Sequence, residues 1–159
     1  MPLRFPCGIV RQQGKAVRIV LQPWFSCFKR GIGDPVLFLI DTGSTGSFLS
    51  EIDAKRFGLD YSALKQLPHD EWVTGIGGNL PLYRITDECK LTFQTAGAQT
   101  HGKREFRMMT LDHFDVVKVE IADNKVREQI LSGIPSILGM DILHNFRFVA
   151  TNDEAYLED

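Results

Sequence analysis

Short apolar runs separated by polar, glycine-containing turns dominate the pattern of hydrophobic and polar positions along this chain. Their length, and their content of β-branched and aromatic residues, are typical of β-strands bounded by turns. We expect strands at residues 16–21, 36–40, 90–95, 106–111 and 146–151, and a hairpin at 72–86. The pattern therefore predicts a mostly β protein.

Helical signals are confined to short segments. Ser50, followed three residues later by Asp53, resembles a capping box, and Gly58 stands where a helix commonly ends. These signals predict a helix at residues 51–57. A last turn or two of helix is expected from residue 141 to 146, with Asp141 as its N-terminal cap.

Residues 112–134 allow two interpretations. Residues 116–121 read as a strand, whereas Val126, Ile130 and Leu131 share one face of a short helix. The acidic residues at the C-terminus are expected to fray, as chain ends commonly do.

Size and composition bound the possible functions. With 159 residues, the chain is long enough for one well-buried domain, which we expect to span residues 1–159. A charged fraction of 24% and a net charge of −2 give no reason to expect nucleic acid or an anionic membrane as a partner. No apolar run approaches the ~20 residues of a membrane span, and the N-terminus lacks a signal-peptide core, so we expect a cytoplasmic protein.

The residues that most often bind metals show no metal-ligand spacing. Cys7, Cys27 and Cys89 are an odd number of cysteines, which reduced thiols explain more simply than a disulfide framework. The four histidines are also scattered along the chain. We therefore expect neither a metal nor a cofactor.

Residues 36–46 are the most informative stretch, because an apolar run delivers the carboxylate of Asp41 onto a turn of small residues. Two glycines in this turn permit backbone angles that other residues resist. Hydroxyl groups that can donate hydrogen bonds come from Thr42, Ser44 and Thr45. The pattern predicts a carboxylate that is held rigidly at the end of a buried strand.

Asp41, Thr42, Gly43 and Ser44 together resemble the active-site loop of aspartic proteases. Two further matches follow in the order found in that family. Residues 72–79 are similar to the glycine-rich flap of retroviral-type proteases, and residues 137–143 to the apolar-apolar-Gly strand and short helix that close the same fold. The sequence is thus identified as resembling the retropepsin-like aspartic proteases. The resemblance implies a single-lobe, closed, barrel-like β fold with one or two short helices, whose motif-bearing core covers about residues 15–152.

The same resemblance assigns roles to residues. Asp41 would be catalytic, Thr42 and Gly43 would support its loop, and Ser44 would donate its hydroxyl to the outer oxygen of Asp41 and shift the working pH toward acid. The flap would grip the substrate through Thr74, Gly75, Ile76, Gly77 and Gly78. The fold-closing motif would be Ile137, Leu138 and Gly139.

Catalysis of this kind needs two carboxylates that share one proton. The sequence contains no second Asp-Thr-Gly or Asp-Ser-Gly besides that of Asp41. A two-fold homodimer would supply the missing group by placing two copies of Asp41 side by side. We therefore expect a homodimeric endopeptidase with a protein or peptide substrate.

The chain departs from the retroviral enzymes in two places. Met140 and Asp141 follow Gly139 where those enzymes carry arginine and asparagine, and the aspartate that they use to hold the peptide backbone is missing after Ser44. The resemblance therefore does not carry over their subunit contacts and outer subsites.

Two alternative functions remain open at this stage. A hydrophobic strand followed by Asp-Thr-Gly-Ser-Thr also describes a phosphate-binding turn of ATPases and sugar kinases, although the further motifs of those enzymes are missing. The second alternative keeps the fold but uses its cleft only to bind peptides or to assemble complexes.

Overall fold

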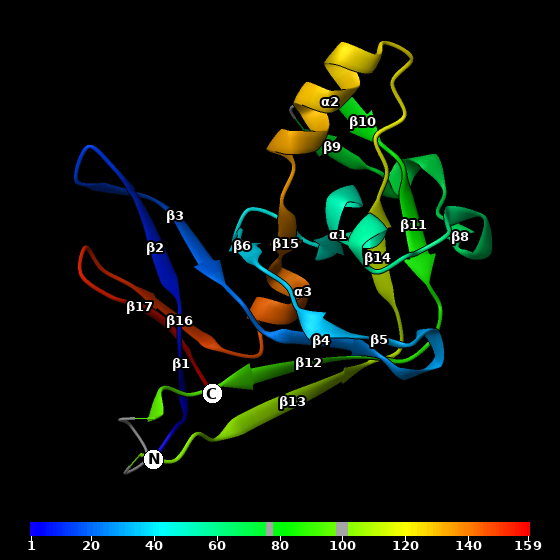
Figure 1. Cartoon of the computed structure of the whole chain (residues 1–159). Helices are drawn as coiled ribbons and strands as arrows, with labels where there is room; N and C mark the ends of the chain where they lie inside the picture. Colours follow the sequence, from blue (N-terminus) through cyan, green and yellow to red (C-terminus); the bar gives the residue numbers. More distant parts are fainter. Residues whose placement is uncertain (76–77, 98–101) are drawn as a thin grey trace.

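The computed structural model describes residues 1–75, 78–97 and 102–159, and its described part is mostly β (Figure 1). Four sheets and three α-helices are present there, against the one or two helices expected. The α-helices are α1 (Glu51–Arg56), α2 (Asn124–Gly133) and α3 (Met140–Leu143). Short 3-10 turns lie at Phe28–Arg30, Tyr61–Ala63 and His69–Glu71.

The largest sheet has eight strands in the order β2-β3-β6-β15-β7-β14-β11-β8. In that order the strands are Gly8–Gln12, Lys15–Leu21, Phe38–Ile40, Ser136–Leu138, Phe48–Leu49, Phe114–Val117, Leu82–Ile85 and Lys65–Gln66. Most neighbours are antiparallel, but β6 pairs in parallel with β15 and β7 in parallel with β14. Parallel pairs join segments that are far apart in the sequence, so this sheet unites the first and last thirds of the chain.

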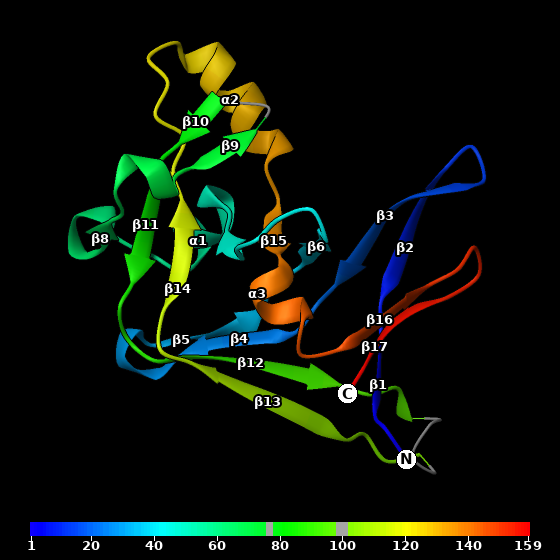
Figure 2. The same ribbon diagram turned by 180° about the vertical axis from the view of Figure 1, so that it is seen from behind.

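Three smaller sheets complete the fold. A four-stranded sheet, β13-β12-β4-β5, consists of Phe106–Leu111, Cys89–Gln94, Trp24–Cys27 and Ile32–Pro35. A three-stranded sheet, β1-β17-β16, consists of Arg4–Pro6, Ala155–Glu158 and Arg147–Ala150. The β9–β10 hairpin consists of Val73–Gly75 and Gly78–Leu80. The β2–β3 and β16–β17 hairpins project to one side of the molecule (Figures 1 and 2).

Most of the expected strands are confirmed with small shifts at their ends. The strand expected at 36–40 is shorter, because β6 begins at Phe38. The hairpin expected at 72–86 is also shorter, since β11 leaves it and pairs with β14 and β8. Pro81, which has no backbone N–H to donate, separates β10 from β11.

The segment 112–134 contains both a strand and a helix. Strand β14 ends at Val117, before the expected limit of residue 121, and α2 begins after Asp123, whose carboxylate caps it. Of the three apolar residues predicted to share one helix face, Leu131 is buried but Val126 is 42% exposed. The helix is therefore confirmed, while its expected apolar face is only partly buried.

The prediction that the C-terminus frays is wrong. Strand β17 is the central strand of its sheet, between β1 and β16, and the Leu157 side chain is fully buried. The acidic charge of Glu158 is balanced by ion pairs with Arg4 and Arg147. The prediction rested only on the acidic residues of this end. It missed the alternating apolar residues Ala155 and Leu157, which face the core.

Two apolar clusters stabilise the described part of the molecule. The larger one joins the four-stranded sheet to the centre of the eight-stranded sheet, and its fully buried aromatic side chains include Phe5, Phe25 and Phe38. The smaller one consists of Phe48, Leu67, Leu80, Leu82 and Val117. Burial of such side chains contributes roughly 1.5–3 kcal/mol each.

All three cysteines lie in the described part and are free thiols. Burial raises the pKa of the Cys7 thiol to about 12 and also raises the pKa of the Cys89 thiol. Both thiols therefore stay protonated near neutral pH. No helix in the described ranges is both long and apolar enough to cross a membrane.

Candidate active site

Asp41 follows directly after strand β6, in the interior of the eight-stranded sheet. Phe38 and Ile40 anchor the strand in the core, and β15 runs parallel beside it with Leu138 opposite Ile40. The Asp41 N–H donates to the carbonyl oxygen of Leu138 at 3.0 Å, one step past the last strand pair. The backbone is therefore fixed up to the residue that carries the carboxylate, and the Asp41 side chain lies half-exposed.

The loop after β6 also holds the carboxylate itself. The Gly43 N–H donates to Asp41 Oδ1 at 2.9 Å, and the Ser44 N–H donates to the Asp41 carbonyl oxygen at 3.2 Å. A Cβ at position 43 would lie 3.2 Å from Oδ1, closer than ordinary contact. Thr42 and Gly43 are exposed. The loop thus presents an oriented carboxylate and leaves part of its own surface exposed.

Contrary to expectation, the Ser44 hydroxyl does not donate to the Asp41 carboxylate. It donates to the Gly46 carbonyl oxygen at 2.8 Å and so closes a local turn. Serine hydroxyl groups often bond to backbone groups two residues away, and the sequence alone did not show which acceptor would be closer. Ser44 therefore stiffens the loop in this structure.

Backbone hydrogen bonds join residues 139–141 to the Asp41 loop. The Met140 N–H donates to the Ser44 carbonyl oxygen at 2.8 Å, and the Asp141 N–H donates to that of Thr45 at 3.0 Å. Gly139 makes this approach possible, because a Cβ there would lie 2.5 Å from the Gly46 carbonyl oxygen. The predicted fold-closing motif thus meets the Asp41 loop directly.

Asp141 has a role that the sequence did not predict. The residue at the N-cap of α3 is Gly139, whereas the Asp141 carboxylate accepts hydrogen bonds from Ser47 N–H at 3.1 Å and Ser47 Oγ at 2.5 Å. The Ser47 hydroxyl in turn accepts from the Gly139 N–H at 2.8 Å. The prediction of Asp141 as a helix cap is wrong because its carboxylate turns toward the loop, where Ser47 is buried. Ser47 directly follows the stretch 36–46 and Asp141 lies within the motif at 137–143, but their 94-residue separation conceals the contact.

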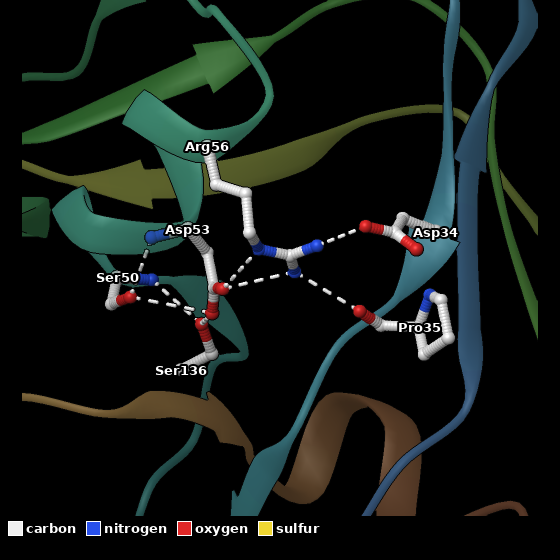
Figure 3. Close-up of polar contacts among 6 residues, drawn as sticks. All are labelled: Asp34, Pro35, Ser50, Asp53, Arg56 and Ser136. Atoms are coloured by element: carbon white, nitrogen blue, oxygen red, sulfur yellow. Dashed lines mark hydrogen bonds and ion pairs between the residues drawn. The ribbon is translucent and has the colours of Figure 1, made fainter.

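A second polar network joins α1 to strands β15 and β5 (Figure 3). Asp53 accepts from the Ser136 hydroxyl at 2.5 Å, and Ser136 Oγ accepts from the Ser50 N–H at 2.8 Å. Arg56 contacts Asp53 at 3.0 Å and also pairs with Asp34 in strand β5. Helix α1, which begins just after the loop and β7, is thereby fixed to both β15 and β5.

A buried ion pair fixes the other side of α1. Glu51 is only 2% exposed, and its carboxylate accepts from the Val119 N–H at 3.1 Å and pairs with Arg127 of α2. Arg127 also donates to the Val119 carbonyl oxygen at 3.1 Å. A buried charge that keeps all its partners fixes a geometry more than it adds stability.

The predicted flap is the β9–β10 hairpin. Gly75 pairs with Gly78, which adopts a positive φ of 83°, and the Thr74 hydroxyl donates to Asn79 at 2.8 Å. Ile76 and Gly77 of the predicted flap lie outside the described residues. At the base of the hairpin, Val73 packs against the smaller apolar cluster and Leu80 belongs to it. Among the described residues, no hydrogen bond or ion pair joins this hairpin to the Asp41 loop.

Comparison with known proteins identifies the family. The family model described as aspartyl protease matches residues 30–142, which is well over half of the 159 residues. The fold and the site define a retropepsin-like β protein, and the chain belongs to the aspartyl protease family. The matched region contains the Asp41 loop, the β9–β10 hairpin and Gly139.

One solved structure supports the assignment of the fold, and a second gives a weaker match. The crystal structure of a retropepsin-like aspartic protease from Rickettsia conorii matches with a TM-score of 0.54 at 18% identity, over 99% of this chain and 90% of that chain. The EIAV protease complexed with the inhibitor HBY-793 matches with a TM-score of 0.44 at 18% identity, over 86% of this chain and 93% of that chain. The assignment of the fold rests on the former. A search of curated protein sequences found no match.

We predict that Asp141→Ala lowers the free energy of unfolding by about 2–3 kcal/mol, because it leaves the buried Ser47 N–H and hydroxyl without their acceptor. Urea unfolding measures this change. Asp112→Ala is the matched control, since Asp112 is exposed and lines a surface hollow together with Ser47 and Asp141. If Asp141 acts through Ser47, the losses in Asp141→Ala and Ser47→Ala are not additive in the double variant. Fully additive losses would contradict this contact.

Proposed function

We propose that this protein is an aspartic endopeptidase in which Asp41 and Asp41 of the partner subunit form the catalytic dyad of a homodimer. The observation that carries the proposal is the half-exposed Asp41 carboxylate, held by the Gly43 N–H at the end of a buried strand in a member of the aspartyl protease family. Each chain would form a single domain over residues 1–159.

The chemistry follows from two carboxylates at close range. At about 3 Å and an effective dielectric near 20, two ionised groups repel by roughly 5 kcal/mol, so the pair retains one proton. The ionised member takes a proton from a bound water, and the protonated member donates to the oxygen of the scissile carbonyl. The hydroxide formed in this way adds to the carbonyl carbon and gives a tetrahedral intermediate. The carboxyl group that took the proton from water then donates it to the amide nitrogen, so that the C–N bond breaks and the amine leaves without a metal or cofactor.

The parts around the dyad would position the peptide. The exposed Thr42 is available to hydrogen-bond across the two-fold axis, and Gly139 keeps the fold-closing segment close beneath the loop. The predicted flap, residues 74–78, belongs to the β9–β10 hairpin. It would lay its backbone along an extended peptide and exclude water from the site. The arrangement supports cleavage of extended or unfolded segments.

We predict that activity requires the dimer. Sedimentation should show a homodimer at working concentration, with an interface of at least ~1,000 Å² in total. Replacing half of the wild-type protein by Asp41→Asn at constant total concentration, under exchange of subunits, should reduce activity to about a quarter of that of pure wild type, because only one dimer in four then carries two carboxylates. A loss of only half would mean that each subunit works alone.

A further inference from the structure

Strand β3 brings the side chain of an arginine, Arg18, close to the proposed catalytic residue Asp41. Val20 pairs with Leu39 and Leu21 with Phe38 in the antiparallel β3–β6 ladder. Continued by two residues, this register places Arg18 opposite Asp41. Arg18 and Asp41 also line one hollow of about 450 Å³. The residues that line it are Val17, Arg18, Ile19, Leu39, Ile40 and Asp41.

Arg18 lies on the open face of this ladder. Phe38 and Ile40 point into the core, whereas Leu39 and Asp41 alternate with them on the other face. Residues directly opposite in an antiparallel pair project from the same face, so Arg18 shares the face of Asp41. The Arg18 side chain is exposed there.

Within the described ranges, the Arg18 side chain makes no hydrogen bond and no ion pair. Eight of the other nine arginines contact an acidic side chain or a carbonyl oxygen, and the ninth, Arg104, lies beside the side-chain amide of Gln94. Arg18 lines one hollow with Asp41 and another with Asp53. Asp53 is engaged by Ser136 and Arg56, and no ion pair joins Arg18 to Asp41 in the described part of the chain. The guanidinium group is therefore available to an incoming ligand.

We propose that Arg18 forms a subsite beside the catalytic aspartate that selects an acidic side chain of the peptide substrate. This proposal rests on the protease function proposed above. The apolar side chain of Leu39, which lies on the same face, suits the methylene groups of a glutamate, while the guanidinium group can bind its carboxylate through two parallel hydrogen bonds. The exposure of Arg18 limits the gain to about tenfold in kcat/KM.

The test compares peptide pairs that differ only by glutamate or glutamine at one position, scanned through the residues flanking the scissile bond. At a pH near 6, above the ordinary glutamate pKa of about 4.3, the glutamate is ionised. At one position, we expect the wild type to prefer glutamate by about tenfold in kcat/KM. Arg18→Gln should reduce this ratio to about one, and Arg18→Glu should favour a lysine peptide instead. Arg147→Gln, which removes an exposed arginine from another sheet, should keep the ratio.

A binding measurement with Asp41→Asn separates this proposal from the protease function. The variant should bind the glutamate peptide more tightly than the glutamine peptide, and Arg18→Gln in the same background should remove the difference. Discrimination in binding without any cleavage by the wild type would uphold the subsite and overturn the protease function. Cleavage without a glutamate preference at any position would overturn the subsite alone, and the absence of both binding and cleavage would overturn both.

Discussion

Asp41→Asn is expected to lower peptide cleavage by at least ~10³-fold, because the dimer then lacks both groups that could activate the water. Folding should survive, since asparagine still offers an oxygen to the Gly43 N–H that now donates to Asp41 Oδ1 at 2.9 Å. We expect the free energy of unfolding to change by no more than about 1 kcal/mol. Digestion of a denatured protein mixture across a range of pH, paired with urea unfolding, measures both quantities.

Asp153→Asn is the control for this experiment, because Asp153 is an exposed aspartate in the turn between β16 and β17. It should retain wild-type cleavage. Equal cleavage by Asp41→Asn and wild type would place the activity elsewhere in the molecule or in a contaminant. Peptide binding by a wild type that cleaves nothing would favour the noncatalytic binding module over the enzyme.

Gly139→Ala is expected to destabilise the protein by about 3 kcal/mol and to abolish cleavage. A Cβ at this position would lie 2.5 Å from the Gly46 carbonyl oxygen and 2.7 Å from that of Ser44. Both neighbours are backbone atoms of the Asp41 loop, so relief of the clash requires the loop to move. The φ of −101° at Gly139 is open to alanine, and the loss therefore comes from space and not from backbone strain.

Thermal or urea unfolding tests this prediction, with a decrease in Tm of roughly 10 °C expected for a chain of this size. Gly133→Ala is the matched control, because a Cβ at Gly133 meets nothing within 4 Å. That variant should stay within about 0.5 kcal/mol of wild type. A Gly139→Ala variant as stable and active as Gly133→Ala would show that the loop does not depend on this close approach.

Local patterns in the sequence correctly predicted most strands and the helix at α1. The capping residue Ser50 does accept from the Asp53 N–H, and Gly58 does adopt a positive φ of 69° after the helix. These features depend on residues within one or two turns of each other, which is the range over which propensity and capping act. The rigid turn at Asp41 was predictable for the same reason.

Contacts between distant segments were not predictable in this way. The Asp141 carboxylate was expected to cap its own helix, but folding places Ser47 beside it and gives it two donors. The acidic C-terminus was expected to fray, but pairing with β1 on one side and β16 on the other fixes β17. Each error arose because a residue had a plausible local role and a more favourable distant partner.

The sequence by itself determined the strand that carries Asp41, the glycine-containing turn that follows it and the family to which the chain belongs. Only the tertiary structure decided what surrounds this turn: Gly139 lies against its backbone, the Asp141 carboxylate accepts from Ser47, and Arg18 lines the same hollow as Asp41. The physical reason is that hydrophobic periodicity specifies which residues are buried, whereas the alignment of strands from opposite ends of the chain specifies which polar groups meet.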